Sequence, residues 1–174
     1  MKFSLEQSLH ILERIPSILR TLLVNLDEEW IYNNEGPETW SPFDIVGHLI
    51  HGEKTDWLLR VKIILKGGPN PGFEPFDRFA QFDQSKGRSL EILLQEFDQL
   101  RSANLIELKR YNLGESDFVK IGIHPKFGQV TLKNLISSWV VHDLSHLAQI
   151  SRVMAKQYRV EVGPWVEYLP ILSS

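Results

Sequence analysis

Apolar side chains recur at three- and four-residue spacings in four long segments of this chain, and this periodicity constrains its fold more than any other feature. The segments cover residues 4–27, 42–66, 89–111 and 131–158. Amphipathic helices of this length bury their apolar stripes against one another, and long connections allow crossovers between them. The pattern predicts an all-α protein, a four-helix bundle with long crossover loops. The length predicts a single domain over residues 1–174.

The ends of the predicted helices carry their own signals. Ser41 can cap the second helix, Pro42 suits its first position, and Asp44 stands where a capping-box acid belongs. Thr131 can cap the fourth helix in the same way. Pro16 lies inside the first segment and lacks a backbone N–H. We therefore expect either a kink there or two short helices that meet at the proline.

Two long connections separate the predicted helices. Residues 66–89 show no periodicity but contain four phenylalanines, and aromatic residues are rare in disordered linkers. We interpret this connection as a packed crossover, with a substrate lid as the alternative. Residues 116–130 are punctuated by Pro125 and Gly128. We expect one small hairpin there, just before the last helix.

The composition argues against several classes of function. A formal net charge of −3, with scattered lysines and arginines, leaves no basic face for nucleic acid and no polybasic patch for a membrane. No apolar run approaches the roughly 20 residues of a membrane-spanning helix, and the charged N-terminal segment does not resemble a secretion signal. The sequence contains no cysteine, which rules out disulfides and thiolate ligands. We expect a cytoplasmic protein that binds neither nucleic acid nor membrane.

Two histidines on the fourth predicted helix have the spacing of metal ligands. His142 and His146 are four residues apart, so their side chains stack on one helical face. The same face carries Leu135, Trp139 and Ile150, which places both imidazoles on the core-directed stripe. Unpaired buried polar groups cost a few kcal/mol, and metal ligation removes this penalty. The glutamate of HExxH metalloproteases is missing from this segment.

A third candidate ligand lies on the second predicted helix. His48 shares a face of mostly polar and small residues with Asp44, His51, Gly52 and Thr55. Bundles build metal sites from side chains on facing helices. We therefore predict that His48 joins the histidine pair of the fourth helix as a ligand. His51 has three alternative roles: a fourth ligand, a general base, or a residue at the mouth of the pocket.

Three imidazoles leave at least one coordination position open, as in catalytic zinc sites. We expect zinc or nickel as the ion, with iron and manganese as alternatives, because imidazole suits several divalent transition metals. The remaining histidines, His10 and His124, are interpreted as ordinary surface or core residues. Arg60 and Arg152 are candidate anchors for a substrate carboxylate, but solvated helix positions are the favoured interpretation of both.

The motifs that contain these histidines resemble those of the DinB-like superfamily. They are TWSPFDIVGHLIHGE at residues 39–53 and HPKFGQVTLKNLISSWVVHDLSHLAQISRVM at residues 124–154. The wider relatives of this superfamily include bacillithiol transferases and mycothiol-dependent maleylpyruvate isomerases. The resemblance implies a four-helix bundle that holds a metal in a histidine triad near one end. The family's ligands fall on His48, His142 and His146, and His51 stands where many relatives have an acid.

The resemblance implies a metal-dependent transferase that activates a low-molecular-weight thiol and acts on a small-molecule substrate. A metal with an open position lowers the pKa of a bound thiol, and His51 is the candidate catalytic base. A metal-dependent hydrolase is the first alternative. A metal-binding or stress-response protein without catalysis is the second. Family members are often homodimers, and the resemblance allows the same assembly here.

Overall fold

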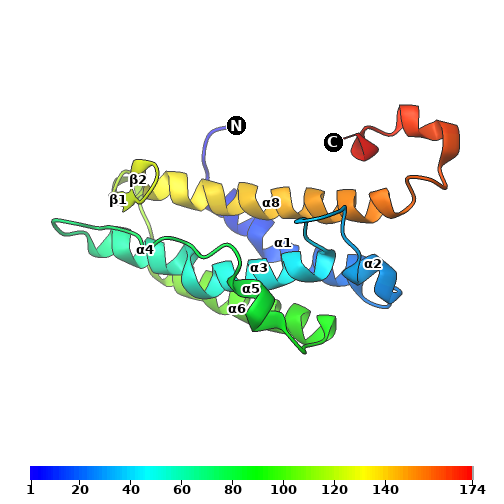
Figure 1. Ribbon diagram of the computed structural model, residues 1–174. Coiled ribbons are helices and arrows are strands. Elements are labelled where there is room, and N and C mark those ends of the chain that lie inside the picture. Colours follow the sequence, from blue (N-terminus) through cyan, green and yellow to red (C-terminus); the bar gives the residue numbers. More distant parts are fainter. Residues whose placement is uncertain (174) are drawn as a thin grey trace.

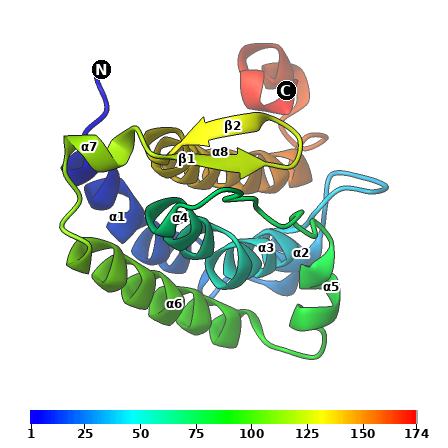
Figure 2. The same ribbon diagram turned by 90° about the vertical axis from the view of Figure 1, so that its left-hand side faces the viewer.

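Four helical stretches pack side by side and form the body of the molecule (Figures 1 and 2). The computed structural model describes residues 1–173. The stretches are α1 (Leu5–Leu23), α3 (Pro42–Thr55) continued by α4 (Trp57–Lys66), α6 (Leu90–Arg110) and α8 (Leu132–Gln157). Helix α6 contacts α1 and α3, whereas α8 contacts α1, α3 and α4. The predicted all-α four-helix bundle with long crossovers is confirmed.

Short helices occupy the connections and follow the last long helix. Helix α2 (Glu28–Tyr32) joins α1 to α3, and α5 (Ala80–Ser85) packs on α3 within the first long crossover. Helix α7 (Glu115–Phe118) lies in the second crossover. Two 3-10 helices, η1 (Gly163–Tyr168) and η2 (Pro170–Leu172), follow α8, and η2 packs on it. Within residues 1–173, no helix combines the length and the apolar character needed to cross a bilayer.

The predicted starts of two core helices are confirmed. The hydroxyl of Ser41 accepts the backbone N–H of Asp44 (3.2 Å), and the Asp44 carboxylate accepts the backbone N–H of Ser41 (2.9 Å). Thr131 and Asn134 exchange the same pair of bonds at the start of α8. These reciprocal bonds satisfy backbone donors that the helix itself leaves unpaired. They therefore fix the first residues of α3 and α8. The starting residue of each helix in turn determines which of its side chains face the core.

Helix α1 excludes one of the two alternatives expected at Pro16, the pair of short helices. It runs as one helix through the proline and ends at Leu23, short of the predicted end at residue 27. Pro16 has no N–H to donate to the carbonyl of Leu12. The buried guanidinium of Arg101 donates to that carbonyl instead, at 2.9 Å. Beyond the helix, Asn25 is left-handed (φ 64°), so the chain cannot continue helically.

The second predicted helix is divided at Asp56. Its backbone (φ −120°, ψ −79°) departs from helical values, so α3 ends before this residue and α4 begins after it. The main-chain bonds from Asp56 to Gly52 (3.0 Å) and from Arg60 to Asp56 (2.9 Å) continue across the break. The expectation of one helix over residues 42–66 is therefore wrong at this point. Periodicity cannot reveal the break, because the apolar positions on both sides keep their phase.

The expected hairpin before the last helix is confirmed. Strands β1 (Ile121–His124) and β2 (Gly128–Thr131) pair antiparallel, with His124 opposite Gly128. The loop between the strands has three residues and is followed by Gly128, whose backbone is left-handed (φ 70°), a conformation that glycine adopts without steric cost. The hairpin lies over the start of α8 and beside α4 (Figure 2).

The first crossover is bound to this hairpin. The backbone N–H of Phe73 donates to the carbonyl of Ile123 (2.9 Å), and the buried Phe73 ring fills the space beside Gly122. This contact agrees with the interpretation of a packed crossover. Not all of its phenylalanines are buried, because the side chains of Phe79 and Phe82 are exposed.

The core divides into two apolar clusters with a polar layer between them. On α8, Trp139 belongs to one cluster and Ile150 to the other. The polar layer is formed by buried or half-buried side chains of three helices: His48, Glu53, Arg101, His142, Asp143 and His146. Charged and polar groups at such a depth require partners, so this layer is where a functional site is expected.

Candidate metal centre

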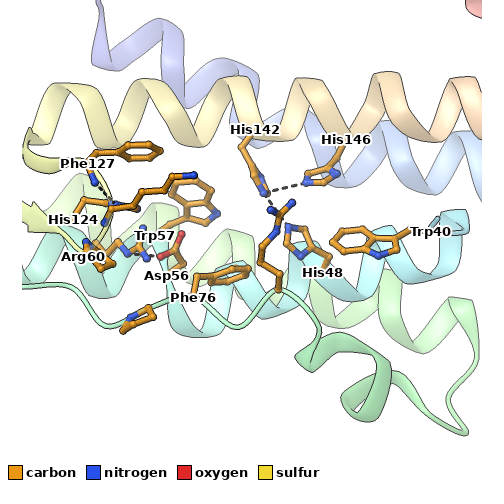
Figure 3. A pocket seen from close by; sticks show the side chains of 15 residues that line it. Trp40, His48, Asp56, Trp57, Arg60, Phe76, His124, Phe127, His142 and His146 are labelled. Atoms are coloured by element: carbon orange, nitrogen blue, oxygen red, sulfur yellow. Dashed lines mark hydrogen bonds and ion pairs between the residues drawn. The ribbon is translucent and has the colours of Figure 1, made fainter. Parts of the chain in front are cut away.

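Three histidine side chains from two helices meet in the polar layer (Figure 3). Helix α3 contributes His48, and α8 contributes His142 and His146, one turn apart. The Nε2 atom of His142 lies 3.2 Å from that of His48 and 3.1 Å from that of His146. Two nitrogens bound at about 2.1 Å to one ion, with roughly 90–109° between them, are about 3.0–3.4 Å apart. The structure thus brings the three predicted ligands to separations that suit a single divalent ion.

Contacts on the far side of two rings indicate which nitrogen is free to ligate. His146 Nδ1 lies 2.8 Å from Oε1 of Gln149, and His142 Nδ1 lies 3.3 Å from Oδ1 of Asp143. Because these oxygens accept, each Nδ1 carries the ring proton and each Nε2 presents a lone pair. Two such lone pairs 3.1 Å apart repel each other unless a cation lies between them. The donor arrangement therefore fits a metal ion.

Burial keeps two of the three rings neutral. It lowers the pKa of His48 to about 3 and the pKa of His146 to about 4, and neighbouring histidines add to both shifts. Neutral imidazole is the form that binds a metal, because a protonated nitrogen has no free lone pair. At neutral pH, protons therefore do not compete for these rings. The Nδ1 atom of His48 is buried without a hydrogen-bond partner among the described residues.

Behind the triad lies a buried network of charges that the apolar periodicity does not predict. Arg101 on α6 is 1% exposed and pairs with Glu53 on α3 and with Asp143 on α8, each at 2.7 Å. The indole N–H of Trp139 also donates to Glu53 (3.2 Å). Since Asp143 contacts the ring of His142, the network holds one of the candidate ligands in its orientation.

The sequence does contain a signal for this network. Arg101 lies in phase with Phe97, Leu105 and Leu108 on the apolar stripe of α6. A cation at a core position requires a buried anion, because an unpaired buried charge costs several kcal/mol. The acid next to the first histidine of the HDLSH segment, Asp143, could therefore have been recognised as a partner from the sequence.

The triad faces a cavity of about 620 Å³ with aromatic walls (Figure 3). The rings of Trp40 and Phe76 lie with centroids 4.8 and 5.4 Å from that of His48, and Trp57 lies 5.0 Å from the ring of His142. A volume of this size is typical of small-molecule sites. The side chain of His142 is 25% exposed, so a ligand in the cavity can reach the triad.

One acid lines the cavity among the described residues, and it is Asp56. Asp56 is 7% exposed and forms an ion pair with Arg60 one turn later. Burial raises the pKa of Asp56, and the positive charge of Arg60 counteracts this shift. Arg60 is itself 8% exposed, and its guanidinium lies 5.0 Å from the Phe73 ring centroid. The expectation that Arg60 is a solvated helix residue is therefore wrong, because the first crossover covers it.

His51, the predicted catalytic base, is not among the residues that line the cavity. Its side chain is buried, its ring centroid lies 4.9 Å from that of Phe76, and its Nε2 lies 3.4 Å from the Thr55 hydroxyl. A base has to reach the proton that it removes, and the cavity wall presents Asp56 for this role. The role of His51 stays a prediction that this geometry does not favour.

The other residues considered from the sequence have different surroundings. His10 is exposed, as expected of a surface histidine. His124 is half-buried and lines the cavity, and it lies outside the one histidine cluster that could hold a metal among the described residues. Arg152 contacts the Glu35 carboxylate through Nε (3.0 Å) and Nη2 (2.7 Å). It therefore anchors a carboxylate of the chain itself and is not a freely solvated residue.

Comparisons with known proteins place this arrangement in a family. The model of the DinB superfamily matches residues 11–150, a range that includes all three histidines of the triad. The chain belongs to the DinB superfamily. The search of curated proteins gave no significant match. Among solved structures, YfiT from Bacillus subtilis has a TM-score of 0.76 at 21% sequence identity, over 90% of this chain and 90% of that chain. YfiT is described as a probable metal-dependent hydrolase with an unusual four-helix bundle topology.

For this DinB-superfamily protein, the family match confirms the resemblance drawn from its two histidine motifs. At 21% identity, the likeness to YfiT shows a shared fold. The ligand roles of His48, His142 and His146 stay predictions, which the convergence of their Nε2 atoms supports.

Proposed function

We propose that this DinB-superfamily protein binds one divalent transition-metal ion through His48, His142 and His146 and hydrolyses a small molecule held in the adjoining cavity. The observation that carries the proposal is the meeting of three imidazoles, with Nε2 separations of 3.1 and 3.2 Å, beside a cavity of about 620 Å³. Three protein ligands leave a position open, as catalytic sites do. The description of YfiT as a probable metal-dependent hydrolase points in the same direction.

A divalent ion bound at this triad would supply Lewis acidity, which activates water and polarises a substrate oxygen. Zinc and nickel both suit three imidazole ligands, with iron and manganese as alternatives. Asp56 is the candidate general base, because its carboxylate lines the cavity and burial raises its pKa above the ordinary value of an aspartate. Trp57 and Phe76 exclude bulk water from the reacting group and contact the apolar part of the substrate.

A thiol transferase is the second candidate, and the volume of the cavity favours it. A space of about 620 Å³ accommodates a molecule of considerable size, so a low-molecular-weight thiol and its electrophilic partner can be bound together. Asp56 would then receive the proton of the thiol. Because the chain contains no cysteine, the sulfur has to come from the thiol cosubstrate.

Activity assays on zinc- and nickel-loaded protein separate these candidates. We expect hydrolysis within a panel of activated esters, amides and phosphoesters, and loss of this activity in His142→Gln. In Asp56→Asn, kcat should fall about 10²–10⁴-fold while metal content is unchanged. The exposed-site variant His10→Gln should keep full activity.

The alternative outcomes are equally distinct. Conjugation of a low-molecular-weight thiol to monochlorobimane, without hydrolysis of the panel, would favour the transferase. Hydrolysis that persists undiminished in His142→Gln would contradict a metal-dependent mechanism. Metal binding without turnover in either assay would favour a non-catalytic metal-binding protein.

A further inference from the structure

The end of the cavity away from the triad is lined by donors and positive charge. Figure 3 shows His124 and Arg60 at one end and the histidine triad toward the other, with Asp56 between them. Arg78 and Lys126 also line the wall. The hairpin of the second crossover supplies His124 and Lys126, and the first crossover supplies Arg78.

His124 presents a hydrogen-bond donor. Its Nδ1 accepts the backbone N–H groups of Lys126 (3.1 Å) and Phe127 (3.2 Å). Burial lowers the pKa of His124, and the charges of Arg60 and Lys126 lower it further. A neutral imidazole that accepts at Nδ1 carries its proton on Nε2. The ring that lines the cavity is therefore a donor at Nε2.

The charges of the cavity wall do not balance. Asp56 is the one acid among its described residues, and Arg60 forms an ion pair with it. Arg78 and Lys126 contribute two further positive charges. Both side chains are exposed, so they attract an anion to the mouth of the cavity, where salt screens the attraction.

We infer that the cavity accepts a small molecule with an oxyanion group, a carboxylate or phosphate, on an aromatic or apolar body. The inference rests on the proposed function, because it names the substrate class of the same site. His124 and Lys126 bind the oxyanion at the hairpin end. The body of the molecule lies against Trp57 and Phe127. Arg78, which lines the same cavity, adds to the positive charge that attracts the oxyanion.

Ligand binding to the metal-free protein tests this inference without turnover. Titration calorimetry compares phenylacetate and benzylphosphonate with the neutral phenylacetamide, which has a similar shape. We expect at least one anion to bind about tenfold or more tightly than the amide, with an affinity that falls as salt rises. An amide that binds as tightly as both anions, or anions without measurable binding, would overturn the inference. The preferred anion distinguishes a carboxylate from a phosphate ligand.

Two variants locate the anion. Lys126→Gln should reduce the affinity for the preferred anion about fivefold or more and leave the affinity for the amide unchanged. The matched control is Lys86→Gln, which removes an exposed lysine that does not line the cavity and should bind like the wild type. Equal losses in both variants would show a general effect of net charge and overturn the assignment to this cavity.

Anion binding and metal-dependent hydrolysis at this site can be lost independently of each other. Anion binding without hydrolysis in any metal-loaded sample would leave the inference standing and remove the proposed hydrolase. Metal-dependent hydrolysis combined with equal binding of anion and amide would support the proposed hydrolase and overturn the inference of an oxyanion ligand.

Discussion

At the scale of single residues, the candidate metal centre depends on which nitrogen of each imidazole keeps its proton. Gln149 and Asp143 contact the Nδ1 atoms of His146 and His142, so the Nε2 lone pairs of both rings point toward each other. Without a cation between them, these two acceptors repel each other. With a metal cation between them, the two nitrogens form a coordination site. The same two contacts explain why these histidines are not simply paired with each other as donor and acceptor.

The lowered pKa values of His48 and His146 predict how the metal-free protein responds to acid. Their native values, about 3 and 4, lie below the ordinary value of 6.5, so the unfolded chain takes up protons first. The stability contributed by the neutral rings is therefore complete above pH 6.5 and is lost as the pH falls toward 4. Between about pH 7 and pH 5, each ring should account for a loss on the order of 2 kcal/mol in the free energy of unfolding.

Urea unfolding in EDTA measures this loss. The His48→Gln/His146→Gln variant should lose less stability than the wild type over this pH interval. The exposed His10→Gln should behave like the wild type. The same pH dependence in the double variant and the wild type would show that these rings do not carry the effect.

Three of the residues that form this site could be predicted from the sequence, and others could not. His142 and His146 follow from a four-residue spacing on an apolar stripe, and His48 follows from a polar face on a facing helix. Asp56 could not be identified in this way, because a break in the helix directs it to the cavity. Arg78 comes from a crossover without periodicity, where no spacing indicates what a side chain contacts.

At the scale of elements, the helices supply the triad and the crossovers complete the cavity. Phe76 comes from the first crossover and His124 from the second. The two crossovers are joined where Phe73 packs beside Gly122. The sequence predicted the four helical stretches and the hairpin, but not the end of α1 at Leu23 or the break at Asp56. It could not predict how the connections meet, because non-local pairing leaves no periodic signal in either segment.

Gly122 makes the contact between the crossovers testable. A Cβ atom at this position would lie 2.5 Å from Phe73 Cζ and 2.8 Å from Ile64 Cγ1, far inside van der Waals contact. Gly122→Ala should therefore destabilise the protein by about 1–3 kcal/mol, because the buried side chains of Phe73 and Ile64 have to shift to admit the methyl group. Urea unfolding provides the measurement. Gly72→Ala in the same crossover is the matched control, since its nearest neighbour would be Asn70 Oδ1 at 3.7 Å. Equal changes in both variants would contradict the packing described.

At the scale of the whole molecule, one buried arginine joins all four helical stretches. Arg101 on α6 donates to the Leu12 carbonyl on α1 and pairs with Glu53 on α3 and Asp143 on α8. The Leu12 carbonyl is available because Pro16, one turn later, cannot donate to it. The proline that suggested a broken helix is therefore part of the contact that ties α1 to the polar layer.

This network predicts a particular response to substitution. Arg101→Met should destabilise the protein by about 3–5 kcal/mol, because Glu53 and Asp143 are left buried without a counter-charge. Adding Glu53→Gln and Asp143→Asn should recover part of that loss, since no unpaired charge then remains in the core. Chemical denaturation of the single and triple variants measures both effects. A triple variant less stable than Arg101→Met would contradict the idea that uncompensated charge causes the loss.

The proposed chemistry of this protein depends on the metal centre, and metal content tests that centre most directly. Protein purified without a metal-affinity column is equilibrated with zinc, passed through a desalting column and analysed by mass spectrometry of the metal. We expect about one ion per chain in the wild type and in His10→Ala, and almost none in His48→Ala/His142→Ala. An equal metal content in the double variant and the wild type would contradict the assignment of the histidine triad.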